Sequence, residues 1–170
     1  MPMSAFIRGL RDKIGNDLLM VPTVSVLTFD ETGRVLLVRH VEGDLWTTPG
    51  GMIEPCETPV DAALREMWEE TNLEVELTRI IGVFGGPLCS ITYSNGDRMA
   101  WVSTLFGARV VSGVLRPDGD ETLEARYFDR VELRSMPRKP HVDLFIDAAF
   151  GHGDGAAFQR PSWKPPDARD

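Results

Sequence analysis

One segment of helical length, residues 58–72 with the sequence TPVDAALREMWEETN, constrains this chain more than any other. Thr58 is a favourable N-cap, Pro59 suits the first helical position, and Asn72 suits the left-handed residue that ends many helices. The segment therefore predicts a helix with two defined ends. Its apolar positions cover one arc of a helical wheel, which we expect to face the core: Val60, Ala63, Leu64, Met67, Trp68 and Thr71.

Three glutamates, Glu66, Glu69 and Glu70, lie at the border of this apolar arc, because the spacing i, i+3, i+4 brings them to one face. Like charges at this spacing weaken a helix by roughly 0.2–0.5 kcal/mol per pair. A bound cation would offset that repulsion, and clustered carboxylates suit Mg²⁺ or Mn²⁺. Taken alone, the three acids also fit an ordinary solvated face.

The loop before the helix adds groups that could serve a ligand. Gly50 and Gly51 follow Pro49 and let the backbone approach a bound molecule closely. Glu57 ends the loop, and Arg65 of the helix could pair with Glu57 or Glu66 and so orient a carboxylate. The glycines alone also fit a tight turn, and Arg65 alone also fits a surface ion pair.

Together these residues resemble the Nudix hydrolase signature, which is Gly, five residues, Glu, seven residues, then Arg-Glu-apolar-any-Glu-Glu-any-Gly-apolar. Every acidic position matches in this chain, where the signature is Gly51, Glu57, Arg65, Glu66, Met67, Glu69, Glu70, Asn72 and Leu73. Asn72 replaces the final glycine, which the left-handed C′ position tolerates. Cys56 stands where the loop commonly has glycine. Upstream and downstream residues extend the resemblance over residues 20–150, including Trp46 and the segments 33–39 and 121–133.

The resemblance implies an α/β fold, namely an α/β/α sandwich with a mixed β-sheet. We expect an N-terminal helical extension at residues 1–19, the Nudix domain at 20–150 and a flexible C-terminal tail at 151–170. The implied activity is Mg²⁺-dependent (or Mn²⁺-dependent) hydrolysis of the diphosphate linkage in a nucleoside diphosphate derivative. The implied catalytic set is Glu57, Arg65, Glu66, Glu69 and Glu70, and the implied metal ligands are Glu66, Glu69, Glu70 and the Gly50 carbonyl.

Other assignments stay open at the level of the sequence. The general base could be Glu70, Glu121 or Glu124. Candidates for phosphate binding are Arg39, Arg98 and Arg126, although each also fits a surface arginine. Candidates for base stacking are Trp46, Phe84, Tyr93 and Trp101, although aromatic residues at strand spacing also fit a core. His40, His141 and His152 lack metal-ligand spacing and are expected to be structural or exposed.

The sequence narrows the range of possible substrates but does not identify one. Pro87 lies close to where Nudix members that cleave ADP-ribose carry a proline, and Tyr93 lies loosely where members that cleave dinucleoside polyphosphates carry a tyrosine. We therefore expect ADP-ribose or a nucleotide sugar. The alternatives are a nucleoside triphosphate pyrophosphohydrolase and a catalytically silent nucleotide-binding module. The C-terminal tail, with Phe158 and Trp163, could dock on a neighbour or on the substrate cleft.

Composition excludes several other classes. The net charge of −8 argues against a protein that holds a nucleic-acid backbone. No apolar run approaches the about 18 residues that a membrane span needs, and charged residues interrupt the N-terminus, so neither a membrane anchor nor a secretory signal is expected. Cys56 and Cys89 are too few for a disulfide framework, which favours a cytoplasmic protein. The expected partner is a small nucleotide-type substrate. The oligomeric state stays open, with a homodimer as one alternative because the resemblance is to a family in which dimers are frequent.

Patterns of polarity and turn residues predict the remaining elements. A short amphipathic helix capped by Ser4 should contain Phe6, Ile7, Leu10 and Ile14. Asn95-Gly96 predicts a hairpin between segments 90–93 and 99–110. Further strands are expected at 21–29, 34–40, 73–84 and 121–128, a connecting loop at 111–119 and a helix at 141–150. The Nudix resemblance implies a turn at 131–133, after the last of these strands.

Overall fold

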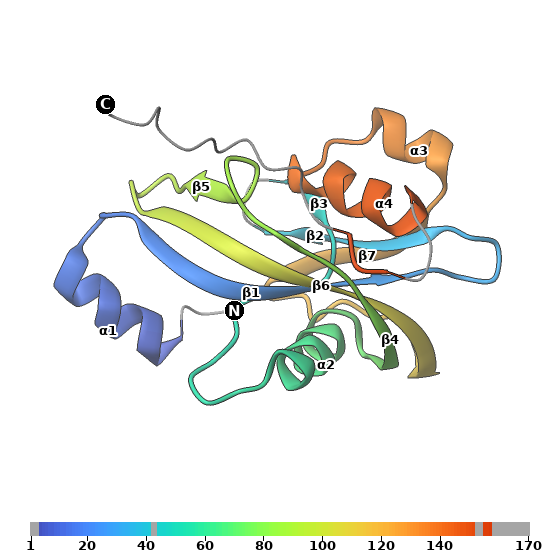
Figure 1. Ribbon diagram of the computed structural model, residues 1–170, viewed down its shortest axis with the longest axis horizontal. Coiled ribbons are helices and arrows are strands. Elements are labelled where there is room, and N and C mark those ends of the chain that lie inside the picture. The colour runs from blue at the N-terminus through green and yellow to red at the C-terminus, as the bar shows by residue number, and fades with distance from the viewer. Residues whose placement is uncertain (1–3, 42–43, 152–154, 158–170) are drawn as a thin grey trace, which may run out of the picture.

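The computed structural model describes residues 4–41, 44–151 and 155–157, and two β-sheets form its centre (Figure 1). The larger sheet is mixed and has the order β1 (Leu19–Thr28), β6 (Arg98–Gly113), β4 (Leu73–Phe84), with β5 (Ser90–Thr92) paired to the start of β6. In it β1 runs parallel to β6, whereas β4 and β5 run antiparallel to β6. The smaller, antiparallel sheet has the order β3 (Trp46–Thr47), β2 (Val35–His40), β7 (Thr122–Phe128).

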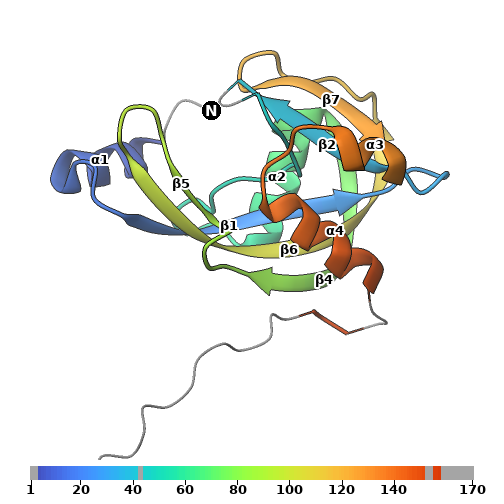
Figure 2. The same ribbon diagram turned by 90° about the horizontal axis from the view of Figure 1, so that it is seen from above.

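Helices cover both outer faces, which confirms the expected α/β/α sandwich with a mixed sheet. The helix α2 (Pro59–Thr71) lies on one side, and α3 (Arg130–Ser135) and α4 (His141–Gly151) lie on the other (Figure 1). The first helix, α1 (Ala5–Ile14), lies at one end of the molecule beside β5 (Figure 2). One core cluster includes Phe145 of α4, and the other includes Met67 of α2. No helix within the described ranges is both long and apolar enough to cross a membrane.

Most predicted elements form close to their expected bounds, but the strand β3 and the helix α3 were not predicted. β6 continues to Gly113 into the expected loop at 111–119. The two-residue strand β3 is too short to show in a polarity pattern. The turn expected at 131–133 is wrong, because the helix α3 forms there. Asp129 caps α3 by accepting from the backbone of Val131 and Glu132, and the Glu132 side chain bonds back to the Asp129 amide.

The ends of α2 were predicted correctly and its buried face only in part, because Ala63, Met67 and Thr71 are buried as expected. Thr58 Oγ1 accepts a bond from the Asp61 amide at 3.1 Å, and Asn72 ends the helix with φ 58° in the left-handed region. Val60, Leu64 and Trp68 of the expected core stripe are instead 48%, 36% and 54% exposed. The residues that face inward are Ala62, Ala63, Glu66, Met67, Glu70 and Thr71. The helix is therefore rotated so that two of its acids face the sheets.

The glycine loop before α2 is bonded to the edge of β1 that β6 leaves open. The Val24 amide donates to the Gly51 carbonyl and the Val26 amide donates to the Pro49 carbonyl, both at 2.9 Å. A third bond joins Ile53 to Pro22 at 3.2 Å. These bonds resemble those of an added strand, so the sheet fixes the position of the loop relative to α2.

The segment after α4 is described only at residues 155–157. Ala157 donates its amide to the Ile81 carbonyl at 2.6 Å and forms a parallel bridge with Gly82. This short piece therefore lies on the outer edge of β4. His152, Phe158 and Trp163, on which sequence-based expectations rest, lie outside the described residues.

Candidate active site

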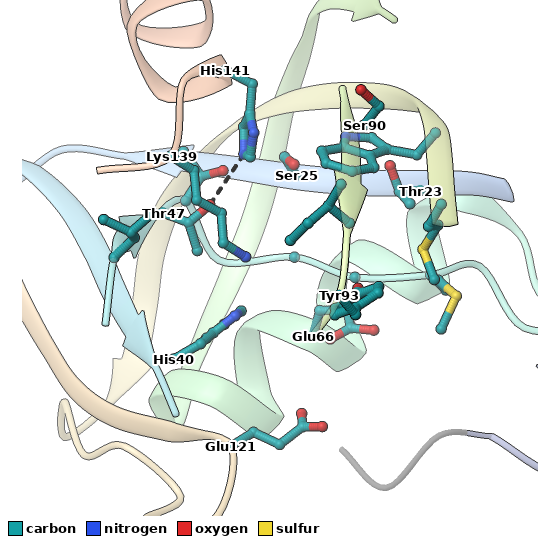
Figure 3. A pocket seen from close by; sticks show the side chains of 18 of the residues that line it. Thr23, Ser25, His40, Thr47, Glu66, Ser90, Tyr93, Glu121, Lys139 and His141 are labelled. Carbon is teal, nitrogen blue, oxygen red and sulfur yellow. Dashed lines mark hydrogen bonds between the residues drawn. The ribbon is translucent and has the colours of Figure 1, made fainter. Parts of the chain in front are cut away.

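A cavity of about 830 Å³ opens between the two sheets, and distant parts of the chain line it. Its floor holds Glu66 of α2 and the backbone of the glycine loop (Figure 3). Its walls come from α1, the middle of β1, the end of β2, the β5–β6 hairpin, the turn at Glu121 and the segment 139–141. Aromatic and apolar side chains share these walls with hydroxyl and charged groups, as is usual for sites that bind small molecules.

Two of the three signature acids are buried at this floor. Glu66 is 3% exposed and Glu70 is 2% exposed, and both line the cavity. The Gly50 amide donates to Glu70 Oε2 at 2.9 Å, and His40 Nε2 donates to Glu70 Oε1 at 2.6 Å. Glu70 is therefore held from two sides, by the glycine loop and by β2.

Burial raises the pKa of Glu66 from 4.5 to about 7, and the negative charge of Glu70 acts in the same direction. The hydrogen bond from Arg65 opposes this shift but does not cancel it. The raised pKa of Glu66 indicates that there is too little positive charge around the two buried carboxylates. A cation bound between them would supply it.

Arg65 joins the remaining acids into one network. Its guanidinium donates to Glu57 at 2.8 and 2.9 Å, to Glu66 at 2.8 Å and to Glu69 at 3.0 Å, and also to the Met52 carbonyl at 3.1 Å. These bonds lower the pKa of Glu57 and raise that of Arg65 above its ordinary value. Arg65 was expected to pair with Glu57 or Glu66, and it pairs with both. Glu57 itself lies behind the cavity and does not line it.

Both glycines of the loop are needed because other atoms occupy the space of a side chain. A Cβ on Gly51 would lie 2.4 Å from Glu66 Oε1. A Cβ on Gly50, which has φ +145°, would lie 2.2 Å from the Val24 carbonyl oxygen. Further along the loop Cys56 adopts φ 69°, so a non-glycine residue maintains the left-handed backbone there.

The donor atoms at the floor suit a hard divalent ion, although only part of the expected ligand set converges. Among the residues described, no three His, Cys, Asp or Glu side chains are arranged around one point that could hold a metal. Glu69, the third glutamate of the helix, is exposed and bonded to Arg65. Glu66 and Glu70 do meet at the cavity, and they provide the buried carboxylate oxygens that Mg²⁺ and Mn²⁺ prefer.

The aromatic candidates divide into two groups. Tyr93 and Trp101 line the cavity, where they could contact a base. Trp46 and Phe84 are 7% and 2% exposed and belong to the core cluster under α4. Trp46 packs edge-on against Phe128, with 4.5 Å between the ring centroids. Its position therefore gives no support to its expected role as a substrate-stacking residue.

The arginine candidates lie outside the cavity lining. Arg39 pairs with Asp44 and Glu124, and Arg98 Nη2 lies 3.4 Å from Asp17 Oδ1. Arg126 lies over the ring of Phe128, with 3.9 Å between the guanidinium carbon and the ring centroid. Their positions give no support to the expectation that they bind phosphate.

Four basic residues at the cavity were not anticipated as site residues: Arg11, His40, Lys139 and His141. Figure 3 shows the last three. His40 follows a register shift in the β2–β7 pairing, and such irregularities commonly redirect a side chain. His141 Nε2 lies 3.1 Å from Thr47 Oγ1, and burial lowers the pKa of His141 to about 4. No sequence motif links His40 to Glu70, thirty positions away, so only the fold could reveal their contact.

Comparison with known proteins agrees with this geometry. The NUDIX domain model matches residues 19–147. A MutT-like protein of Streptomyces ambofaciens is 33% identical over 131 residues, covering 77% of this chain and 78% of that protein. A provisionally named 8-oxo-dGTP diphosphatase of Bacillus subtilis is 30% identical over 127 residues, covering 73% and 78%. The solved structure of an ADP-ribose pyrophosphatase from Streptococcus suis has a TM-score of 0.61 at 20% identity, covering 80% of this chain and 96% of that one, which shows the same fold. The chain therefore belongs to the Nudix family and is a Nudix hydrolase.

Proposed function

We propose that this enzyme uses Mg²⁺ or Mn²⁺ to hydrolyse the diphosphate linkage of a nucleoside diphosphate derivative, with ADP-ribose or a nucleotide sugar as the substrate class. One observation carries the proposal. Two buried glutamates, Glu66 and Glu70, lie at the floor of a cavity large enough for such a molecule. Nudix hydrolases generally use divalent metal ions, and this pair offers the site where an ion would fit.

Glu66, Glu70 and the Gly50 carbonyl would hold the metal, with Glu69 beside them on the same helix. The carbonyls of Pro49 and Gly51 accept bonds from β1, which supports the carbonyl between them as the one turned toward a ligand. When bound, the metal would neutralise charge on the diphosphate and lower the pKa of an attacking water.

The protein's own residues would supply positioning. Arg65 fixes the carboxylates of Glu57 and Glu66, and His40 and the Gly50 amide fix Glu70. Positioning and charge neutralisation are most of what phosphoryl transfer requires, so no covalent nucleophile is needed. Lys139 lines the cavity above Glu66 and would contact phosphate oxygens (Figure 3).

The general base is best assigned to Glu70 or Glu121. Glu121 lines the cavity, and a backbone bond of 2.9 Å from the Val41 amide to its carbonyl holds its turn beside β2. Glu124 is bonded to Arg39 at 2.6 Å and does not line the cavity. Position therefore favours Glu121 over Glu124.

The size and lining of the cavity support a substrate with a base and a second moiety. The volume is near the upper end of the roughly 300–1,000 Å³ usual for small-molecule sites. Tyr93 and Trp101 offer faces for a base, and the likeness to an ADP-ribose pyrophosphatase is consistent with this class. A nucleoside triphosphate pyrophosphohydrolase is the second candidate, because a relative at 30% identity is named for 8-oxo-dGTP.

The test is a panel of ADP-ribose, nucleotide sugars, dinucleoside polyphosphates and nucleoside triphosphates, assayed with Mg²⁺ and with a chelator. We expect ADP-ribose and water to give AMP and ribose 5-phosphate only with the metal. Preferred cleavage of a triphosphate would favour the second candidate. Binding of nucleotides without cleavage of any would identify a silent module.

Matched variants connect turnover to the acids. Glu66→Gln and Glu70→Gln should each lower kcat by about 100-fold or more, since each removes a charge at the metal site. Glu31→Gln, in the exposed turn between β1 and β2, is the control and should keep wild-type kcat. Wild-type rates in both folded floor variants would refute the proposal.

A further inference from the structure

We propose that α1 forms part of the substrate-binding wall and that Arg11 is the positioning residue that holds this wall in place. The helix precedes residue 19, where the match to the family model begins, so the family signature does not account for it. Ile7 and Arg11 of α1 are buried, and both line the cavity. The identity of the ligand rests on the proposed function, whereas the role of the helix rests on the contacts that follow.

Arg11 joins the end of α1 to the start of β6. Its guanidinium donates to the Gly15 carbonyl at 3.1 Å, to the Asp17 carbonyl at 2.7 Å and to the Arg98 carbonyl at 2.8 Å. Its Nε lies 3.8 Å from Asp97 Oδ1. The residue is only 9% exposed, and a buried guanidinium is costly unless it is paired and hydrogen-bonded. Arg11 therefore serves a defined structure at this point rather than solubility.

The structure that Arg11 serves is the turn of the β5–β6 hairpin, at residues 93–98. Inside the turn, the Tyr93 amide donates to the Asp97 carbonyl at 2.8 Å and the Gly96 amide donates to the Tyr93 carbonyl at 2.9 Å. From outside, Asn16 Nδ2 donates to the Asn95 carbonyl at 3.2 Å. The segment after α1 thus contacts the turn at several points along its length.

The same turn forms one side of the cavity, with Tyr93, Asn95 and Asp97 among the lining residues. Figure 2 shows α1 next to this hairpin, and Figures 1 and 2 both place α1 at one end of the molecule, at a distance from α3 and α4. β1 pairs with β6 only as far as Met99, so the turn itself lies beyond the last residue that β1 supports. The bonds from α1 would keep Tyr93 in place before a ligand arrives.

This placement predicts an effect on binding rather than on the chemical step. The acids that we propose to act in catalysis lie on α2, and Arg11 makes its polar contacts with the hairpin and the α1–β1 turn. A wall that is ordered in advance lowers the entropy cost of binding without changing the reacting atoms. Loss of Arg11 should therefore raise KM and leave kcat close to its wild-type value.

The experiment compares Arg11→Met with Arg8→Met, an exposed arginine on the same helix that serves as the control. Amide hydrogen exchange should accelerate by about tenfold or more at Tyr93 and Gly96 in Arg11→Met, because local opening becomes easier. Exchange at Asn72, at the end of α2, should not change. With ADP-ribose as substrate, KM should rise by about tenfold while kcat stays within about twofold of wild type.

Three results would overturn the proposal: unchanged exchange in the turn, faster exchange with unchanged KM, or a fall in kcat as the main effect. If Arg11→Met does not fold, Asn16→Ala removes only the bond to Asn95 and gives the same two readouts. A wild-type enzyme that cleaves no compound would refute the proposed function alone. In that case the equilibrium binding of ADP-ribose is measured in place of KM. The variant whose turn exchanges its amide hydrogens faster must then bind ADP-ribose more weakly than wild type.

Discussion

Gly50 and Gly51 are neighbours in the chain, yet an added methyl group at each would meet a different kind of atom. At Gly51 the Cβ would overlap the carboxylate of Glu66, with 2.4 Å to Oε1 and 2.8 Å to Oε2. At Gly50 it would overlap the backbone of β1, with 2.2 Å to the Val24 carbonyl oxygen. A flexible side chain can move, whereas a strand backbone in a sheet cannot move without losing hydrogen bonds. The two alanine variants should therefore fail in different ways.

Gly51→Ala should fold normally and lose activity. Its φ lies outside the left-handed region, so alanine meets no backbone strain. To restore ordinary contact the Glu66 carboxylate must move by about 1 Å, and a displacement of that size at a catalytic group can cost about 100-fold in rate. We expect kcat to fall by about that factor, which corresponds to about 2.7 kcal/mol, while the free energy of unfolding changes by less than about 1 kcal/mol.

Gly50→Ala should instead unfold more easily. A non-glycine residue at φ +145° costs roughly 1–3 kcal/mol, and separation of the loop from β1 weakens bonds worth about 0.5–1.5 kcal/mol each. A loss on the order of 3 kcal/mol would lower Tm by about 10 °C in a chain of this size.

Thermal unfolding and kcat, measured for both variants and for the wild type, test these two predictions. A Gly51→Ala enzyme with full activity would show that the position of Glu66 does not govern the reaction. A Gly51→Ala enzyme as unstable as Gly50→Ala would refute the argument from flexible and rigid neighbours.

Two further predictions concern charge. Because burial, assisted by the Lys139 charge, lowers the pKa of His141 from 6.5 to about 4, the unfolded chain binds a proton in this pH range that the folded chain does not. The stability that neutral His141 provides should be complete above about pH 6.5 and fall by on the order of 3 kcal/mol as the pH drops toward 4. Urea unfolding across this range should show a flatter acid dependence for His141→Gln, and equal slopes would contradict the assignment. Glu57→Gln weakens the bidentate pair with Arg65, so unfolding should become easier by about 1–2 kcal/mol and kcat should fall by about tenfold. An unchanged kcat would show that Arg65 positions Glu66 without Glu57.

The sequence predicted the elements whose ends carry specific chemistry. The ends of α2 followed from Thr58, Pro59 and Asn72, and the structure has the helix between them. The hairpin followed from Asn95-Gly96, where Gly96 adopts φ 89°. The helix α3 was within reach of the same reasoning, because Asp129 and Glu132 have capping-box spacing.

The inward face of α2 could not be deduced from polarity alone. A helical wheel assigns burial to apolar residues, so Val60, Leu64 and Trp68 were expected inside. In the structure, Glu66 and Glu70 occupy buried positions because they line a cavity rather than a packed core. Polarity patterns assume that buried positions are apolar, and binding sites are where that assumption fails.

Contacts among the candidate site residues could be predicted where they depend on local spacing, but not where they depend on the fold. Arg65 reaches Glu57 across eight positions, a contact that the signature spacing predicts. His40 and Lys139 reach the cavity from strands and turns far along the chain, and nothing in their immediate sequence indicates this. Arg39 has the charge expected of a phosphate ligand, but its two carboxylate neighbours already bind it.

Residues far apart in the sequence line the cavity, and this fixes when the site can form during synthesis. Ile7 and His141 line the same space, and β1 pairs with a strand about eighty positions later, Leu19 facing Met99. Contacts of such long range form late and slow the folding of a chain. While the ribosome is still adding β6, the loop and helix that carry the acids are already made, but the walls that enclose them are not. The nascent protein therefore cannot have a closed site until the segment that contains His141 has emerged, and activity would begin only after that point.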